Sequence, residues 1–77
     1  MNRTYIEGEQ FEGISYQKKD LANGEYENCI FRNCVFSACD FHDIIFADCE
    51  FQECDFSMAN LKSSSFREVK FIRCKML

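Results

Sequence analysis

The six cysteines are the residues of this sequence most able to do chemistry. In a small secreted protein this number suggests a disulfide framework, and clustered thiolates can also hold a zinc ion. Zinc sites usually space paired ligands about two to four residues apart, whereas every spacing here is a multiple of five. The spacing therefore favours reduced thiols that fill a core, with a disulfide or metal cluster as the alternative. The cysteines are Cys29, Cys34, Cys39, Cys49, Cys54 and Cys74.

Candidate catalytic groups are sparse. The one histidine, His42, precedes Asp43, and the two could be imagined as an acid–base couple. Adjacent polar residues at a corner of the chain are more often solvated, as are carboxylates such as Asp40, Glu50 and Asp55. The sequence has no glycine-rich phosphate loop and no serine or cysteine nucleophile placed to pair with a base. We therefore predict that the protein is not an enzyme, and we expect no catalytic, cofactor-binding or metal-binding residue.

Large apolar residues recur every five residues from Cys29 to Leu61, and a small or thiol-bearing residue precedes each by two positions. A five-residue step would carry these side chains around an α-helix, which turns about 100° per residue. In a flat strand, an odd step would send successive large side chains to opposite faces. The pattern works if the chain turns a corner every five residues. It therefore predicts a parallel β-solenoid built from stacked coils of very short strands.

This stretch resembles the pentapeptide-repeat family, whose unit is a small residue, then Asp or Asn, then Leu or Phe, then two freer positions. The resemblance implies an all-β fold, a right-handed quadrilateral parallel β-helix with four repeats in each coil. The chain would then make about three and a half coils, and its register extends from Phe11 to Met76. The closest matches to the polar-then-large pair are Asp40-Phe41, Asp55-Phe56 and Asn60-Leu61.

The charged residues support a coil of 20 residues without reference to the family. Residue n would then lie beside residue n+20, about 4.8 Å away on the next coil. Three pairs of opposite charge face each other at this coil length, and a 15-residue coil would lose all of them. The pairs are Glu50 with Lys70, Glu53 with Arg73, and Asp55 with Lys75.

The chain of 77 residues has room for one domain, which we expect to span residues 1–77. Within it, residues 1–10 are interpreted as an N-terminal cap, residues 11–28 as a degenerate coil and residues 29–77 as regular coils. The start of the chain does not resemble a signal peptide, and no apolar run approaches the roughly 20 residues of a membrane helix. We therefore expect a soluble, cytoplasmic protein that does not bind membranes.

The C-terminal end of the solenoid is the predicted interaction surface. On a 20-residue coil nothing covers the last layer of large side chains, and the same layer exposes the N–H and C=O groups of its strands. Such an edge favours pairing with another chain, which predicts a homodimer through this end. Alternatively, a further repeat of a longer chain would cover this end. The predicted interface residues are Leu61, Phe66, Phe71, Met76 and Leu77.

Function by surface shape and charge is what remains. The preferred hypothesis is a non-catalytic structural or protein-interaction module, which is also a candidate N-terminal part of a longer repeat protein. The alternative, implied by resemblance to the quinolone-resistance branch of the family, is an acidic DNA mimic that binds DNA gyrase, a type II topoisomerase. Residues 1–60 carry twelve acidic and four basic residues, a net charge of −8, whereas residues 61–77 carry five basic residues and Glu68, a net charge of +4. The overall charge of −4 disfavours direct nucleic-acid binding.

Overall fold

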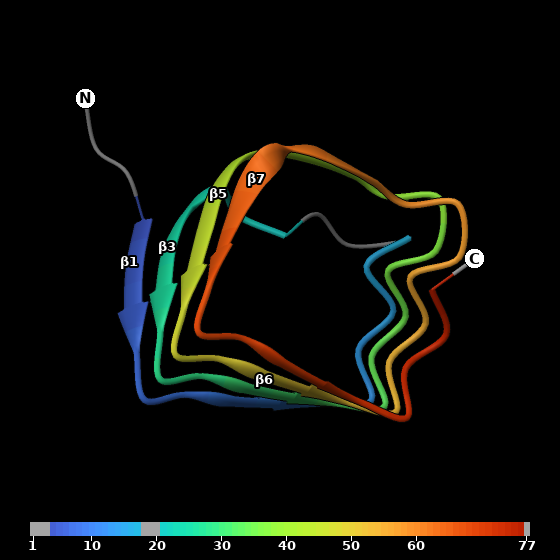
Figure 1. Ribbon diagram of the computed structural model, residues 1–77, viewed down its shortest axis with the longest axis horizontal. Helices are drawn as coiled ribbons and strands as arrows, with labels where there is room; N and C mark the ends of the chain where they lie inside the picture. Colours follow the sequence, from blue (N-terminus) through green and yellow to red (C-terminus); the bar gives the residue numbers. More distant parts are fainter. Residues whose placement is uncertain (1–3, 18–20, 77) are drawn as a thin grey trace.

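A computed structural model of the chain describes residues 4–17 and 21–76. Those residues form eight short strands and no helix, which confirms the predicted all-β class. The strands divide into two parallel sheets of four (Figure 1). One sheet contains β1 (Thr4–Glu7), β3 (Gly24–Glu27), β5 (Asp40–Ala47) and β7 (Asn60–Arg67), and the other contains β2 (Gln10–Glu12), β4 (Ile30–Arg32), β6 (Glu50–Gln52) and β8 (Lys70–Ile72).

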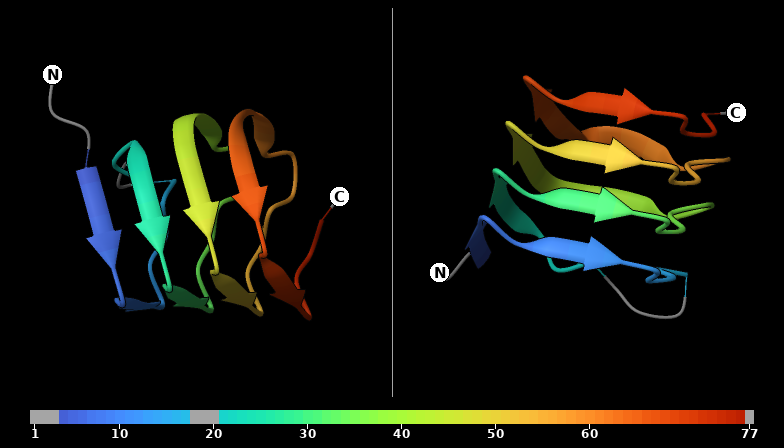
Figure 2. Two further views of the ribbon diagram at one scale, coloured as in Figure 1. Left: turned by 60° about the vertical axis from the view of Figure 1, so that its left-hand side comes forward. Right: turned by 90° about the horizontal axis from the view of Figure 1, so that it is seen from below.

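Each strand pairs with the strand that lies one coil further along the chain. In the second sheet Phe31 lies beside Phe51, and Phe51 lies beside Phe71, so the coil contains 20 residues. The same register holds in the first sheet apart from shifts between Asp40 and Ile44, where β5 turns a corner. Figure 2 shows the resulting stack of coils from two sides. The 20-residue coil inferred from the charges is confirmed.

The chain follows a square path in each coil (Figure 1). The two sheets form adjoining walls, and a row of parallel bridges, in which Val35 pairs with Ser15 below and Asp55 above, forms the third wall. The fourth wall includes the first part of β5, before the corner at Asp43. The fold is therefore the predicted right-handed quadrilateral parallel β-helix.

Most corners among the described residues have one residue with left-handed backbone geometry, although Ser63 does not adopt it. These residues recur every five positions, and Gly8 and Asn28, with φ angles of 71° and 55°, are residue types that adopt this conformation readily. Ala38 and Met58 adopt it too, with φ angles of 60° and 61°. For such residues the conformation costs about 1–2 kcal/mol. The stacking of the coils therefore holds corners that their own residues do not favour.

Gly24 occupies an inward position where the repeat would normally have a small apolar side chain. Its φ angle is 144°, and a Cβ atom there would lie 2.1 Å from the backbone oxygen of Thr4. Gly24 pairs with Thr4 on the coil below and with Ile44 on the coil above. A glycine is needed because the first coil approaches the second too closely for any side chain.

Columns of stacked aromatic rings fill the interior. In one column Phe11, Phe31, Phe51 and Phe71 follow one another with centroid distances of 4.7, 4.9 and 5.4 Å. The column follows from the predicted 20-residue coil, in which residue n lies beside residue n+20. Phe31 and Phe51 are fully buried, while Phe11 at the first coil is only half-buried. Two further columns contain Tyr16, Phe36 and Phe56, and Tyr26, Phe46 and Phe66.

The structure places β1 within the segment interpreted as a cap, where Ile6 lies beside Tyr26 of β3. β2 spans the junction between the cap and the degenerate coil. The division of the chain at residues 10 and 28 stays a prediction.

Removal of a ring from the middle of the column should cost more than removal from its end. Phe51→Ala should lower the free energy of unfolding by roughly 3–5 kcal/mol, because a fully buried ring is replaced by a cavity. Phe11→Ala should cost clearly less, because its ring has a neighbour on one side only. Thermal or urea unfolding followed by circular dichroism measures both. Equal losses would contradict the view that the middle coils organise the fold.

Candidate functional site

Four of the five predicted interface residues lie together at the C-terminal end. Leu61 and Phe66 belong to β7, Phe71 belongs to β8, and Met76 follows the bridge formed by Lys75. Phe71 and Met76 are 39% and 48% exposed, whereas the rings one coil below, Phe51 and Phe56, are buried. The fifth predicted residue, Leu77, lies outside the described residues. The last layer of the core is therefore open on one side.

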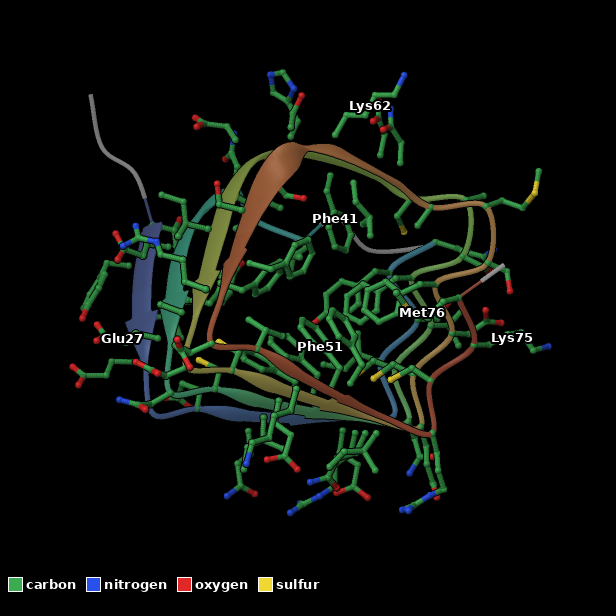
Figure 3. All side chains as sticks on the ribbon, viewed as in Figure 1. Glu27, Phe41, Phe51, Lys62, Lys75 and Met76 are labelled. Carbon is green, nitrogen blue, oxygen red and sulfur yellow. The ribbon has the colours of Figure 1, made fainter. Side chains whose placement is uncertain are left out.

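The large side chains of this layer lie inside the square that the walls enclose. Figure 3 shows Phe41 and Phe51 inside the solenoid, with Lys62 and Lys75 pointing outward. Phe66 stacks on Phe46 at 5.3 Å from the coil below, and no described residue lies above Phe66. Because the outer edges of β7 and β8 have no further strand beside them in their sheets, the end offers both apolar rings and backbone hydrogen-bonding groups.

Basic side chains surround the open layer. Among the described residues, Arg73 forms a salt bridge with Glu53 of the coil below at 3.0 Å. Lys70 and Lys75 are register neighbours of Glu50 and Asp55, as predicted, but no salt bridge within 4 Å joins either pair. Only one of the three predicted charge pairs is therefore a salt bridge. The exposed basic side chains are Lys62, Arg67, Lys70, Arg73 and Lys75.

Asp55, a member of one of these pairs, is hydrogen-bonded within its own turn. Its carboxylate accepts hydrogen bonds from the Ser57 hydroxyl at 2.6 Å and from the Ser57 N–H at 2.9 Å. These bonds lower the pKa of Asp55, and the charge of Lys75 adds a smaller effect in the same direction. The carboxylate is thus held by its own turn, and Lys75 remains available at the surface.

All six cysteines are free thiols at inward positions, and four of them are buried. Each thiol donates a hydrogen bond to a backbone carbonyl on the coil below: Cys54 to Phe31 at 3.3 Å, for example, and Cys74 to Phe51 at 3.2 Å. The predicted placement in the core is confirmed. Among the described residues, no group of three or more His, Cys, Asp or Glu side chains is arranged to hold a metal ion.

Two of the thiols influence each other. Cys54 lies one coil above Cys34, and the neighbouring thiol lowers the pKa of Cys34. The same contact, together with burial, raises the pKa of Cys54. Because Cys34 is only 1% exposed, access and not acidity limits its reaction with reagents.

His42 and Asp43 are exposed near the corner within β5. His42 contributes to the lining of a cavity of about 690 Å³, together with Tyr16, Cys39 and Phe41. The five-residue pattern gave no indication of this hollow. It forms where Leu21–Asn23 of the first coil run outside any strand while the next coil begins β5.

Thiol labelling should separate the cysteines by burial. With a small aromatic disulfide reagent, Cys39 and Cys74, which are half-buried, should react first. The four buried thiols should react at least about tenfold more slowly, because they must wait for local or global opening. All six should react at once in denaturant, which provides the control. Fast modification of more than two thiols in the folded protein would argue against the inward register.

The sequence is similar to a known family of repeat proteins. A family model described as a pentapeptide repeat region matches residues 24–77. No curated protein is significantly similar in sequence to the chain. No helix among the described residues is long and apolar enough to cross a membrane.

Two solved structures of trypsin-treated variants of QnrB1, a plasmid-mediated fluoroquinolone resistance protein, resemble this fold. One is 26% identical with a TM-score of 0.74 and aligns with 86% of this chain and 35% of its own. The other is 27% identical with a TM-score of 0.58 and aligns with 88% of this chain and 32% of its own. The chain thus spans about a third of the length of these structures. With the family model covering most of the sequence and the same coil seen in the structure, the chain belongs to the pentapeptide-repeat family.

Proposed function

We propose that this pentapeptide-repeat solenoid is a non-catalytic interaction module whose binding surface is its C-terminal end. The observation that carries the proposal is the break in the aromatic columns. Phe51 is fully buried beneath Phe71, but Phe71 itself is 39% exposed. The exposed layer consists of Leu61, Phe66, Phe71 and Met76, and the predicted surface also includes Leu77.

The open layer favours another β-structure as its partner. Its strand edges can form backbone hydrogen bonds only with a chain in extended conformation, and its rings need apolar side chains above them. A second copy of the protein provides both, which supports a homodimer through the C-terminal end. The six free thiols support a reducing compartment such as the cytoplasm as the place of work.

A further coil of a longer chain would satisfy the same groups. The QnrB1 structures are about three times longer than the part that this chain matches. A solenoid grows by adding coils that contact only their neighbours, so the last layer of a piece is the natural support for the next coil. In that case the protein is the N-terminal part of a longer repeat module.

A gyrase-binding DNA mimic is the second candidate, and the likeness to QnrB1 favours it. Residues 1–60 carry a net charge of −8, but the last layer is basic and the solenoid is short. A supercoiling assay with purified DNA gyrase tests this candidate. Inhibition of supercoiling, or protection from a quinolone, at tens of micromolar would support this candidate. The absence of both effects would eliminate it.

The association surface can be tested with one substitution. Phe66→Asp places a charge in the open layer and should abolish self-association, which light scattering measures across a dilution series. Ala38→Asp is the matched control, because Ala38 is an exposed corner residue one coil further from the C-terminal end. It makes the same kind of change away from the end. If the control lowers the molecular mass as much as Phe66→Asp, the C-terminal end is not the surface.

A further inference from the structure

The two ends of the solenoid have opposite charge. Residues 61–76 carry five basic residues and one acidic residue, a net charge of +4. At the other end, residues 4–17, which include β1 and β2 of the two adjoining walls, carry Glu7, Glu9 and Glu12 and no basic residue. With Arg3, Lys18, Lys19 and Asp20, which lie outside the described residues, residues 1–20 carry a net charge of −1.

We infer that the C-terminal end of one copy stacks on the N-terminal end of a second copy, so that the second copy acts as the next coil. The inference rests on the proposed function and specifies the partner of the same surface. The three features that support it are the backbone register, the matching side-chain columns and the charges.

The backbone groups at the two ends are complementary. The N–H of Gly8 donates to the carbonyl of Glu27, and at the same corner Asp48 donates to Arg67, one coil ahead in each case. Glu68 occupies this corner in the last coil, and its N–H has no coil ahead of it among the described residues. In a second copy placed as the next coil, the carbonyl of Glu7 stands at the required position.

The next corner repeats the arrangement. Gly13 donates to Arg32, and Glu53 donates to Ile72, which leaves the N–H of Arg73 at the open end. Glu12 of the second copy would accept from it. In the reverse direction, Ile30 donates to Glu9 and Lys70 donates to Cys49. By the same rule, Gln10 of the second copy would donate to Val69. Each end thus offers the groups that the other lacks.

The side chains fall into the same columns. Continuing the 20-residue register beyond the last coil places Ile6 of the second copy on Phe66, and Phe11 on Phe71. Phe11 already stacks on Phe31 at 4.7 Å, and Phe71 stacks on Phe51 at 5.4 Å, so the contact would extend one aromatic column through both copies. On the outer face, Glu7 of the second copy would lie beside Arg67.

A twofold contact between two C-terminal ends lacks this match. It would bring two layers of net charge +4 together, and like charges that face each other across strands are unfavourable. The head-to-tail contact pairs opposite charges. Because its two surfaces differ, it does not close at two copies and can extend into a rod. Mean molecular mass should therefore rise beyond that of a dimer as concentration increases.

One position in the head-to-tail contact does not match. Glu9 of the second copy would lie over Val69, in a column that otherwise contains Cys29 and Cys49. A carboxylate in this column opposes stacking, because burial of a charge without a partner is costly. Glu9→Ala should therefore strengthen association, by about tenfold in the concentration of half-association. The same change should leave a twofold C-terminal dimer unaffected.

Sedimentation velocity of the full chain from about 1 µM to about 100 µM is the basic measurement. Head-to-tail stacking predicts a series of species that grows with concentration and weakens as salt rises, since opposite charges are screened. A C-terminal twofold dimer would stop at two copies and strengthen with salt. A monomer at every concentration would overturn the inference together with the homodimer proposal, and would leave a further coil of a longer chain as the occupant.

Charge reversal at the two ends separates the alternatives. Glu7 and Arg67 are exposed and form no salt bridge with a described residue, so Glu7→Arg and Arg67→Glu should leave the fold intact, as circular dichroism can verify. Each variant alone should associate about tenfold more weakly than the unchanged protein. An equimolar mixture should recover association, because each variant then meets an opposite charge at both ends.

Glu25→Arg is the matched control, because it makes the same charge change on β3, one coil away from the N-terminal end. It should associate like the unchanged protein. If Arg67→Glu weakens association while Glu7→Arg does not, the C-terminal surface of the proposed function stands and the head-to-tail inference falls. If neither variant has an effect on an association that is observed, both the surface and the inference are wrong.

Discussion

Contact between equivalent residues on successive coils is the interaction on which the structure depends. Residue n finds its ring neighbour, its backbone partner and its thiol acceptor on the coils directly above and below. Phe51 illustrates this, since its ring stacks between Phe31 and Phe71 and its carbonyl accepts a hydrogen bond from the Cys74 thiol. Within one coil, rings of neighbouring repeats meet edge to face, as Phe51 does with Phe46 and Phe56 at 5.1 Å, but the backbone ladders run between coils. Each coil is therefore stabilised by its neighbours along the axis. A middle coil has stacking and hydrogen-bonding partners on both sides, while an end coil has them on one side.

The same constraint explains how much the sequence alone could predict. Equivalent positions of successive five-residue units need similar side chains, and this requirement is visible as a spacing in the sequence. The coil length, the aromatic column of Phe51 and the inward cysteines were therefore all predictable. The exposure of Phe71 and Met76 was predictable for the same reason, because they are the last members of their columns. These features depend on spacing and not on fine geometry.

Features that depend on the third dimension were not predictable. The charge pair of Asp55 and Lys75 was correct in register but does not form a salt bridge, and the carboxylate is hydrogen-bonded instead to Ser57 of the same turn. The cavity beside His42 arises where residues 21–23 leave the strand pattern, and no residue type signals its size. The left-handed corners at Ala38 and Met58 contradict the preference of these residues and are imposed by neighbouring coils. The role of Gly24 became clear only from the position of the Thr4 backbone.

An end that is satisfied on one side only is the physical source of the proposed function, and hydrogen exchange tests it most directly. Asp48 and Glu68 are both exposed acidic residues at the same corner of successive coils, with the same φ angle of 53°. They differ in one respect, because the N–H of Asp48 donates to the carbonyl of Arg67 at 2.9 Å, while Glu68 has no described coil above it. In dilute protein, the amide of Asp48 should exchange slowly and that of Glu68 rapidly. Equal exchange rates at the two positions would contradict the stacked coil with an open C-terminal end.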